Sequence, residues 1–237
     1  MSHHYIRFSG VTYRYPDGTT ALDNVNFLIS HGEKVALLGL NGAGKSTLIL
    51  HTNGILMADS GEVNVGDVPV CKKTLPLVRQ SVGMVFQNSD DQLFMPTVEE
   101  DVAFGPLNMG LPQEEVNRRV DKALEDVGAL ELKHRSASAL SGGQKKAVAI
   151  ATVLSMGPSI MVLDEPTSDL DCTARRRLID LLKGFHHTLL VATHDLDLAR
   201  ELCPRSLLLS HGRIIADGPT AGILSDTTLL ASAGMRM

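Results

Sequence analysis

The chain has 237 residues, with 22 basic and 27 acidic side chains and a formal net charge of −5. This acidity argues against a general nucleic-acid binder, because such proteins obtain much of their affinity from Lys and Arg side chains that neutralise phosphates. Hydrophobic residues make up 43% and charged residues 21%, as in an ordinary soluble globular protein. At roughly 150 residues per domain, the length predicts one large domain, or one domain with a subdomain.

No pattern predicts secretion or a membrane span. Cys71, Cys172 and Cys203 are far apart and form no CxxC pair, which is typical of reduced thiols in a cytosolic protein. The N-terminus has no apolar stretch of the kind found in signal peptides. The longest uncharged stretch, 147–163, is interrupted by Gly157-Pro158, and it is shorter than the about 20 apolar residues that a spanning helix needs.

Strand patterns dominate the first 70 residues. Apolar and polar residues alternate over 6–15 and 25–29, as in half-buried strands. Gly66-Asp67 lies between two pairs of valines and predicts a hairpin turn. Residues 35–38 form a continuous apolar run, which is typical of a strand buried on both faces.

Later in the chain, strands alternate with helices. Three apolar runs predict further buried strands: 82–86, 160–163 and 188–192. The clearest helical pattern covers 116–127, with Pro112 near its start and Gly128 after its end. This alternation predicts a parallel sheet, and a last hairpin over 206–217 turns at His211-Gly212.

A helix-rich segment interrupts the alternation. We expect residues 89–155 to form a helical subdomain, while 1–88 and 156–237 build the nucleotide-binding core with its β-subdomain. The predicted fold class is therefore α/β, in a single domain over 1–237.

A phosphate-loop motif follows the first buried strand. Residues 39–47 match GxxxxGK[ST], and 48–55 continue as a helical stretch. Glycines let backbone N–H groups approach phosphate oxygens, and the helix N-terminus adds a partial positive charge. Lys45 would neutralise the β- and γ-phosphates, and the Ser46 hydroxyl would ligate Mg²⁺. The predicted nucleotide-binding residues here are Gly39, Asn41, Gly42, Ala43, Gly44, Lys45, Ser46 and Thr47.

Two adjacent carboxylates end the strand at 160–163. Mg²⁺ prefers oxygen ligands, so Asp164 would hold it directly or through water. Glu165 would accept the proton of the attacking water or polarise it. Acidic residues at a strand end are common on protein surfaces, but the phosphate loop in the same chain favours a metal site.

A second anion-binding helix start is predicted after Leu140. Ser141 can cap the helix that runs to Ser155, and Gly142 and Gly143 expose further N–H groups. Two phosphate-facing helix ends with a single carboxylate pair indicate that two chains share each nucleotide. Such a dimer would be two-fold symmetric.

Together these motifs resemble those of the ATP-binding-cassette (ABC) ATPases, over nearly the whole chain. The resemblance implies a P-loop NTPase core with an antiparallel β-subdomain and an inserted helical subdomain that carries the signature. It also implies Mg²⁺-dependent ATP hydrolysis by a homodimer, although a heterodimer stays open. The signature residues that would face the nucleotide of the partner chain are Ser141, Gly142, Gly143 and Gln144.

The resemblance assigns further residues. Tyr15 would stack on adenine, with Tyr13 as the alternative, and His194 would contact the γ-phosphate. Gln87 would sense Mg²⁺ and a transmembrane partner. Asp169 and Asp171 would communicate across the dimer, although the family more often has Ala or Gly at position 169. Lys145-Lys146 after the signature departs from the commoner Lys-Gln-Arg.

A finer resemblance, over residues 86–99 and 103–106, points to the ATPases of energy-coupling-factor (ECF) transporters. It implies an ATPase at the cytoplasmic face of a prokaryotic cell membrane, with a multispanning coupling subunit, a substrate-binding membrane subunit and no nucleic acid as partners. Cobalt uptake of the CbiO type is favoured, nickel is next, and a vitamin importer is the alternative. Leu93, Phe94 and Met95 would line a groove for the membrane partner, or would simply be buried.

Other interpretations stay open. The same catalytic residues would serve an ATP-dependent switch that acts on a soluble or nucleic-acid partner. The basic cluster 175–177 is interpreted as a solvated helix face, and 186–187 as a loop before a strand. No cluster of side chains predicts a site for the transported solute.

Overall fold

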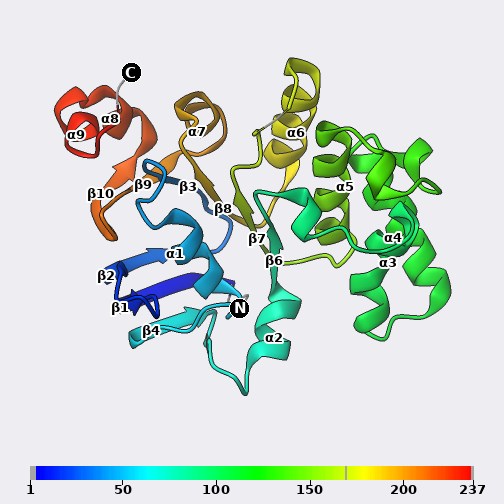
Figure 1. Cartoon of the computed structure of the whole chain (residues 1–237), viewed down its shortest axis with the longest axis horizontal. Coiled ribbons are helices and arrows are strands. Elements are labelled where there is room, and N and C mark those ends of the chain that lie inside the picture. The colour runs from blue at the N-terminus through cyan, green and yellow to red at the C-terminus, as the bar shows by residue number, and fades with distance from the viewer. Residues whose placement is uncertain (1–3, 169, 236–237) are drawn as a thin grey trace.

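A computed structural model describes residues 4–168 and 170–235 of the chain. Figure 1 shows two sheets, with the helix α1 between them and a group of helices at one end. The smaller sheet is antiparallel and has the strand order β2-β1-β4-β5. Its strands are β1 (Ile6–Arg14), β2 (Thr20–Ile29), β4 (Ser60–Val65) and β5 (Val68–Pro69).

The antiparallel sheet buries one face of each long strand. In β1, Ile6 and Phe8 are buried, and the register then shifts before Val11, the next buried residue. Gly10 lies at this shift with a φ of 63°, a conformation that glycine adopts without strain. Alternation therefore predicted the strand, but a bulge decides which later residues face the core.

The larger sheet has the order β10-β9-β3-β8-β7-β6. All neighbours are parallel except β10, which pairs antiparallel with β9. Alternate residues of its central strands enter two hydrophobic clusters, one toward the antiparallel sheet and one on the opposite side. Burial on both faces is what the continuous apolar runs predicted. Its strands are β3 (Lys34–Leu38), β6 (Val82–Val85), β7 (Ile160–Asp164), β8 (Thr188–Thr193), β9 (Arg205–Ser210) and β10 (Arg213–Pro219).

The helix after the phosphate loop, α1 (Lys45–Thr52), begins and ends earlier than the predicted 48–55. It begins inside the motif because Gly44, with a φ of 106°, is its N-cap residue. It ends before Asn53 because Gly54 takes a left-handed φ of 67°. Similarly, β6 is one residue shorter than predicted, so Phe86 lies just beyond its end.

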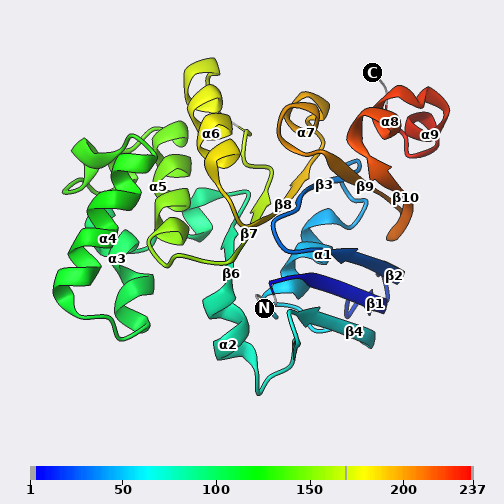
Figure 2. The ribbon, with the colours of Figure 1, turned by 180° about the vertical axis from the view of Figure 1, so that it is seen from behind.

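Three helices, α3 (Val98–Asn108), α4 (Gln113–Asp126) and α5 (Gly142–Leu154), form a subdomain with its own hydrophobic cluster. Figure 2 shows this group from behind, beside β6 and α6. α5 joins the two units: Val148 packs in the helical cluster, while Ile150 and Val153 pack against the large sheet. The fold prediction is confirmed, whereas the subdomain boundaries at 89 and 155 stay a prediction.

The remaining helices cover the sheet and its edges. None of the described helices is both long and apolar enough to cross a membrane. Cys71, Cys172 and Cys203 are all free thiols, as predicted. The other helices are α2 (Leu75–Ser81), α6 (Cys172–Gly184), α7 (Leu196–Leu202), α8 (Thr220–Ser225) and α9 (Thr227–Ser232), with short 3₁₀ turns at Ser89–Asp91, Leu130–Leu132 and Ala137–Ala139.

Candidate nucleotide site

A cavity of 640 Å³ opens where β3, β6 and β7 end. Most of the predicted nucleotide and metal residues line it, although they come from distant parts of the chain. They are Tyr15, Asn41, Gly42, Gly44, Lys45, Ser46, Thr47, Gln87, Asp164 and Glu165. Gly39 and Ala43 do not line the cavity and belong to the backbone of the loop beneath it.

Close packing fixes the phosphate loop. A Cβ added at Gly39 would lie 2.5 Å from the carbonyl oxygen of Leu209, and one at Gly44 would lie 2.6 Å from that of Ala21. Real Cβ atoms essentially never approach backbone so closely. These glycines are therefore required by the chain's own packing.

Lys45 is held at the centre of this loop. Its side chain is 6% exposed, and its ammonium donates hydrogen bonds to the carbonyl oxygens of Gly39 (2.8 Å) and Leu40 (3.3 Å). The same nitrogen lies 3.3 Å from Oε1 of Glu165. A buried ammonium is costly without such partners, so the loop and the carboxylate together fix its place.

Glu165 has an unusual backbone and a complete set of partners. Its φ is 43°, and its N–H donates to the carbonyl oxygen of Ala192 at 2.8 Å. The Thr193 hydroxyl donates to Oε2 at 2.8 Å, and Nδ1 of His194 lies 2.9 Å from Oε1. Non-glycine residues with positive φ concentrate at functional sites.

The environment keeps Glu165 ionised. Burial alone raises the pKa of this carboxyl, but hydrogen bonds from His194 and Thr193 and the charge of Lys45 outweigh it and hold the pKa below its ordinary value. An ionised carboxylate is the form that can polarise or deprotonate water.

The neighbouring carboxyl is in the opposite situation. Burial raises the pKa of Asp164, although hydrogen bonding with Ser46 opposes this. Its Oδ1 is buried and has no hydrogen-bond partner among the described residues. An orphaned, buried carboxylate oxygen beside a hydroxyl suits a hard cation such as Mg²⁺, which prefers oxygen ligands. Among the described residues, no group of three or more His, Cys, Asp or Glu side chains could hold a metal ion together.

Only one of the two candidate tyrosines reaches the cavity. Tyr15 is 38% exposed, lines the cavity, and its hydroxyl lies 2.8 Å from the Thr47 hydroxyl. Tyr13 packs edge-on against Tyr15 and His51 and belongs to the margin of the core. The geometry therefore favours Tyr15 for stacking on a base.

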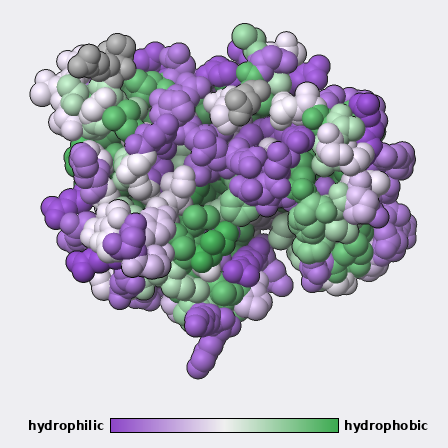
Figure 3. All heavy atoms as spheres, in the orientation of Figure 1, coloured by the Kyte–Doolittle hydropathy of each residue, from purple (hydrophilic) through white to green (hydrophobic). Residues whose placement is uncertain are grey.

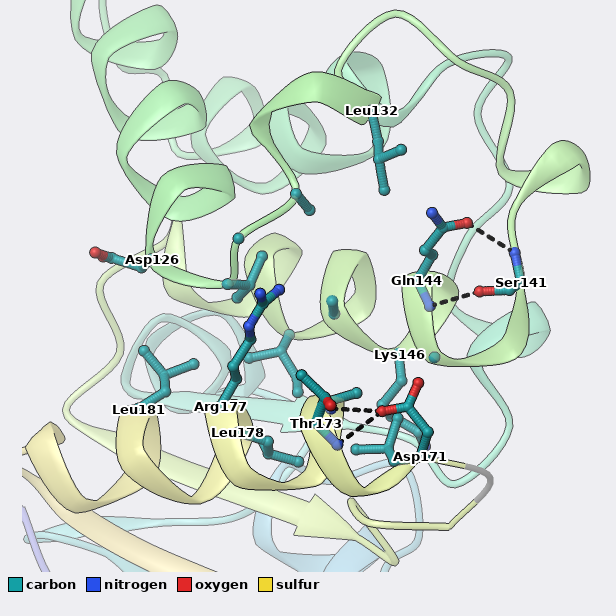
Figure 4. A pocket seen from close by; sticks show the side chains of 18 of the residues that line it. Asp126, Leu132, Ser141, Gln144, Lys146, Asp171, Thr173, Arg177, Leu178 and Leu181 are labelled. Atoms are coloured by element: carbon teal, nitrogen blue, oxygen red, sulfur yellow. Dashed lines mark hydrogen bonds between the residues drawn. The ribbon is translucent and has the colours of Figure 1, made fainter.

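The signature residues lie outside the nucleotide cavity of their own chain. Ser141 and Gln144 form a reciprocal capping box, in which each side chain accepts a hydrogen bond from the backbone N–H of the other (Figure 4). With Gly143 they line a separate cavity of 610 Å³ between α5 and α6. Gly142 is exposed, and an added Cβ would meet no atom of the described part of the chain within 4 Å.

A groove of 600 Å³ connects the two sites. Its lining includes the exposed Gln87, together with Ser46 and Asp164 from the nucleotide cavity and Gly142 from the start of α5. Gln87 lines both the cavity and this groove. The structure thus brings the glutamine beside the predicted metal residues.

The predicted dimer-contact residues are only partly described. Asp169 lies outside the described residues. Asp171 is the N-cap of α6, and its carboxylate accepts hydrogen bonds from the N–H groups of Thr173 and Ala174, both at 2.8 Å. This capping gives Asp171 a structural role inside its own chain.

The basic cluster is only partly solvated. Arg176 and Arg177 are exposed, as predicted, but Arg175 is half-buried and its guanidinium pairs with Asp195 at 3.2 Å. Residues 186–187 lie in the loop before β8, as predicted.

Sequence reasoning missed the part of the cavity formed by the last hairpin. His211 and Gly212 line the cavity at the turn between β9 and β10. The Gly212 N–H donates to the carbonyl oxygen of Ala43 at 3.0 Å, and its own oxygen accepts from the N–H of Asp23. The turn was visible in the sequence, but nothing local showed that it packs on the phosphate loop.

Comparison with known proteins identifies the family. Residues 22–168 match the ABC transporter family model. A putative ABC transporter ATP-binding protein of Geobacter sulfurreducens is 57% identical, over 98% of this chain and 93% of the relative. The energy-coupling factor transporter ATP-binding protein EcfA of Methanocaldococcus jannaschii is 47% identical, over 95% and 82%.

Solved structures agree. CbiO1 of Clostridium perfringens, described as part of the ABC transporter complex cbiONQ, has a TM-score of 0.84 and 38% identity, with 100% of this chain and 96% of that chain covered. A dimeric bacterial ABC transporter cassette has a TM-score of 0.83 and 30% identity, with 91% and 98% covered. The chain therefore belongs to the ABC transporter ATP-binding family, whose members are ATPase cassettes.

Proposed function

We propose that the chain is the ATP-hydrolysing subunit of an ECF-type import complex, and that two copies share each nucleotide. The observation that carries the ATPase assignment is the contact of both Lys45 and His194 with the carboxylate of Glu165, beside the phosphate loop. The similarity to EcfA and to CbiO1 supports the transporter class.

The charge of each site residue sets its role in the proposed reaction. Lys45 and the loop N–H groups bind the phosphates, and the ionised Glu165 orients a water for in-line attack and accepts its proton. Thr193 and His194 hold the Glu165 carboxylate in place. Mg²⁺, which this family normally uses with ATP, would be held by Ser46, Gln87 and Asp164 and would neutralise phosphate charge. Tyr15 would stack on adenine, and Ser141, Gly142, Gly143 and Gln144 would face the nucleotide of the other copy.

The catalytic assignment is tested by Glu165→Gln. The amide keeps the shape of the side chain but cannot accept a proton, so we expect ATP to bind while turnover falls by about 10²–10⁴-fold, the usual contribution of a general base. Fluorescent-nucleotide binding and phosphate release would measure the two effects. Near-normal turnover in this variant would remove Glu165 from the role.

The membrane partner would bind an exposed apolar surface beside the glutamine loop. Phe94 and Phe104 are 63% and 43% exposed and pack edge-on at 4.9 Å, with the exposed Leu107 further along α3. Hydrophobic side chains gather on the α3 side of the helical subdomain in Figure 3. Leu93 is buried in the helical cluster, so it belongs to the core and not to this surface.

The partner assignment is tested by co-expression with neighbouring membrane-protein genes. Phe94→Asp should abolish co-purification, because a charge would be buried at the contact. Leu130→Asp, at another exposed apolar residue (43% exposed) away from this surface, is the control and should assemble normally. If folded Phe94→Asp still co-purified with the membrane proteins, this surface would not be the contact for the membrane partner.

The transported solute is proposed to be a transition-metal ion, with cobalt first and nickel next, and the ATPase to act at the cytoplasmic face of the membrane. Uptake of labelled cobalt, nickel and vitamins by the co-expressed complex distinguishes the metal branch from the vitamin branch. A complex that never forms, with ribosomes or DNA co-purifying instead, would favour the switch interpretation.

A further inference from the structure

One side chain after the signature has a role that the motif does not explain. Lys146 of α5 is only 3% exposed, although it lies two residues after Gln144. Its ammonium donates hydrogen bonds to the carbonyl oxygens of Gln87 (2.5 Å) and Phe86 (3.2 Å). Burying an ammonium costs free energy unless polar groups replace its water, so these two carbonyls are part of its binding site.

Gln92 and Lys145 also fasten the same loop to α5. The Gln92 side chain accepts from the Phe86 N–H at 3.1 Å and donates to the Ala149 oxygen and the Thr152 hydroxyl, both at 2.8 Å. At the surface, Lys145 pairs with Asp90 at 2.6 Å. Residues 86–92 are therefore held against the helix that begins with the signature.

The fastening matters because of where Gln87 lies. Its side chain lines the nucleotide cavity on one side and the groove that leads to Gly142 on the other. The ammonium of Lys146 is also close enough to Asp164 to help lower the pKa of that carboxyl, against the larger effect of burial. Lys146, Gln87 and Asp164 all line that groove.

We propose that Lys146 is a positioning residue, which holds the Gln87 backbone so that the Gln87 side chain reaches the predicted metal residues Ser46 and Asp164. Because Lys146 belongs to α5, it would also couple the orientation of the signature helix to the position of Gln87. This inference rests on the proposed ATPase function. It predicts that the response to Mg²⁺ depends on Lys146, through its hydrogen bond to the Gln87 carbonyl oxygen.

The test compares Lys146→Met with Lys145→Met in the full-length protein. Methionine has a similar length but no donors, so the loop carbonyls lose their partner. Lys145→Met removes a charge from the adjacent position but breaks only the exposed pair with Asp90. Lys146→Arg, which keeps the charge and the donors, is the conservative variant and should restore part of the effect.

Three measurements separate positioning from general stability. With Lys146→Met, amides of residues 87–92 should exchange hydrogen faster, and ATP binding in EDTA should stay at the wild-type level. The Mg²⁺ concentration for half-maximal hydrolysis should rise by about tenfold, in the range found when side chains that support metal ligands are removed. Lys145→Met, which removes only a contact at the surface, should change all three much less than Lys146→Met does.

Wild-type exchange and Mg²⁺ response in Lys146→Met would overturn the proposal, and so would an equal loss of ATP binding with and without Mg²⁺, which marks a purely structural role. If Lys146→Met does not fold, Lys146→Gln, which keeps a shorter donor, is judged by the same criteria. A wild-type protein without Mg²⁺-dependent hydrolysis would instead contradict the proposed function, while the exchange measurement would still test the contact.

Discussion

The two helix N-termini with exposed backbone N–H groups, at α1 and at α5, are built in opposite ways. At α1, the chain's own packing requires the glycines, because side chains at Gly39 or Gly44 would collide with backbone oxygens. At α5, none of the described residues lies within 4 Å of a Cβ that might be added at Gly142. The first site is completed by its own chain, whereas the second leaves space beside its N–H groups.

This difference explains why glycine occurs in both motifs. At α1 it permits a left-handed backbone and close packing, as the φ of 106° at Gly44 shows. Near the start of α5, helix formation alone would favour other residues, since glycine is a poor helix former. Two glycines after Ser141 are thus unfavourable for the isolated chain, and a nucleotide bound by a second copy would give them a function.

The largest expected effect comes from Gly44→Ala. The added Cβ would lie 2.6 Å from the Ala21 oxygen in a left-handed conformation, so we expect loss of measurable nucleotide binding and a lower melting temperature. Gly42→Ala is the control for the melting temperature: its φ of 81° is also positive, but an added Cβ meets no described atom within 4 Å, so it should lower the stability by only roughly 1–2 kcal/mol of backbone strain. Equal effects of the two variants would show that collision with Ala21 is unimportant.

The next effect should come from Gly142→Asp. A carboxylate in the first turn of a helix stabilises it by about 0.3–1 kcal/mol, and no steric conflict arises within the chain, so the melting temperature should be unchanged or higher. ATP-driven dimerisation and hydrolysis should be lost, because the charge would repel phosphate. Size-exclusion chromatography with ATP, in the Glu165→Gln background, would measure the association. A variant that still dimerises with ATP would contradict the inference that the start of α5 binds the nucleotide of a second copy.

The smallest effect on stability concerns the adjacent carboxyls at the end of β7. Because burial raises the pKa of Asp164 in the fold, its ionised form reduces stability as pH rises through that pKa. Asp164→Asn should therefore melt higher than the wild type near pH 7, and the gain should vanish in acid. Each 1 kcal/mol corresponds to about 2–4 °C at this chain length. Mg²⁺-dependent hydrolysis should nevertheless be lost.

Glu165→Gln should respond with the opposite sign. The pKa of Glu165 is lowered in the fold, so its ionised form adds stability above the ordinary carboxyl pKa, and this is lost as pH falls through the lowered value. The variant should therefore melt lower than the wild type near pH 7. Thermal melts of both variants between pH 3 and 8 would measure the two trends, and parallel trends would contradict the pKa assignments.

Local sequence determined much of this protein. The phosphate loop, the carboxylate pair and the capped signature helix were all readable, because each depends on a few neighbouring residues with a fixed chemistry. The buried strands and both hairpins were also predicted, since hydrophobic runs and turn residues are local signals. The order of the motifs then indicated the family.

Only the tertiary structure decided which of several similar side chains meet the site. It placed Tyr15 and not Tyr13 at the cavity, buried Leu93 beneath an exposed Phe94, and packed the His211-Gly212 turn on the phosphate loop. It also buried Lys146 against a loop about 60 residues away. These contacts join distant segments, and sheet topology and helix packing set them, so no local pattern in the sequence records them.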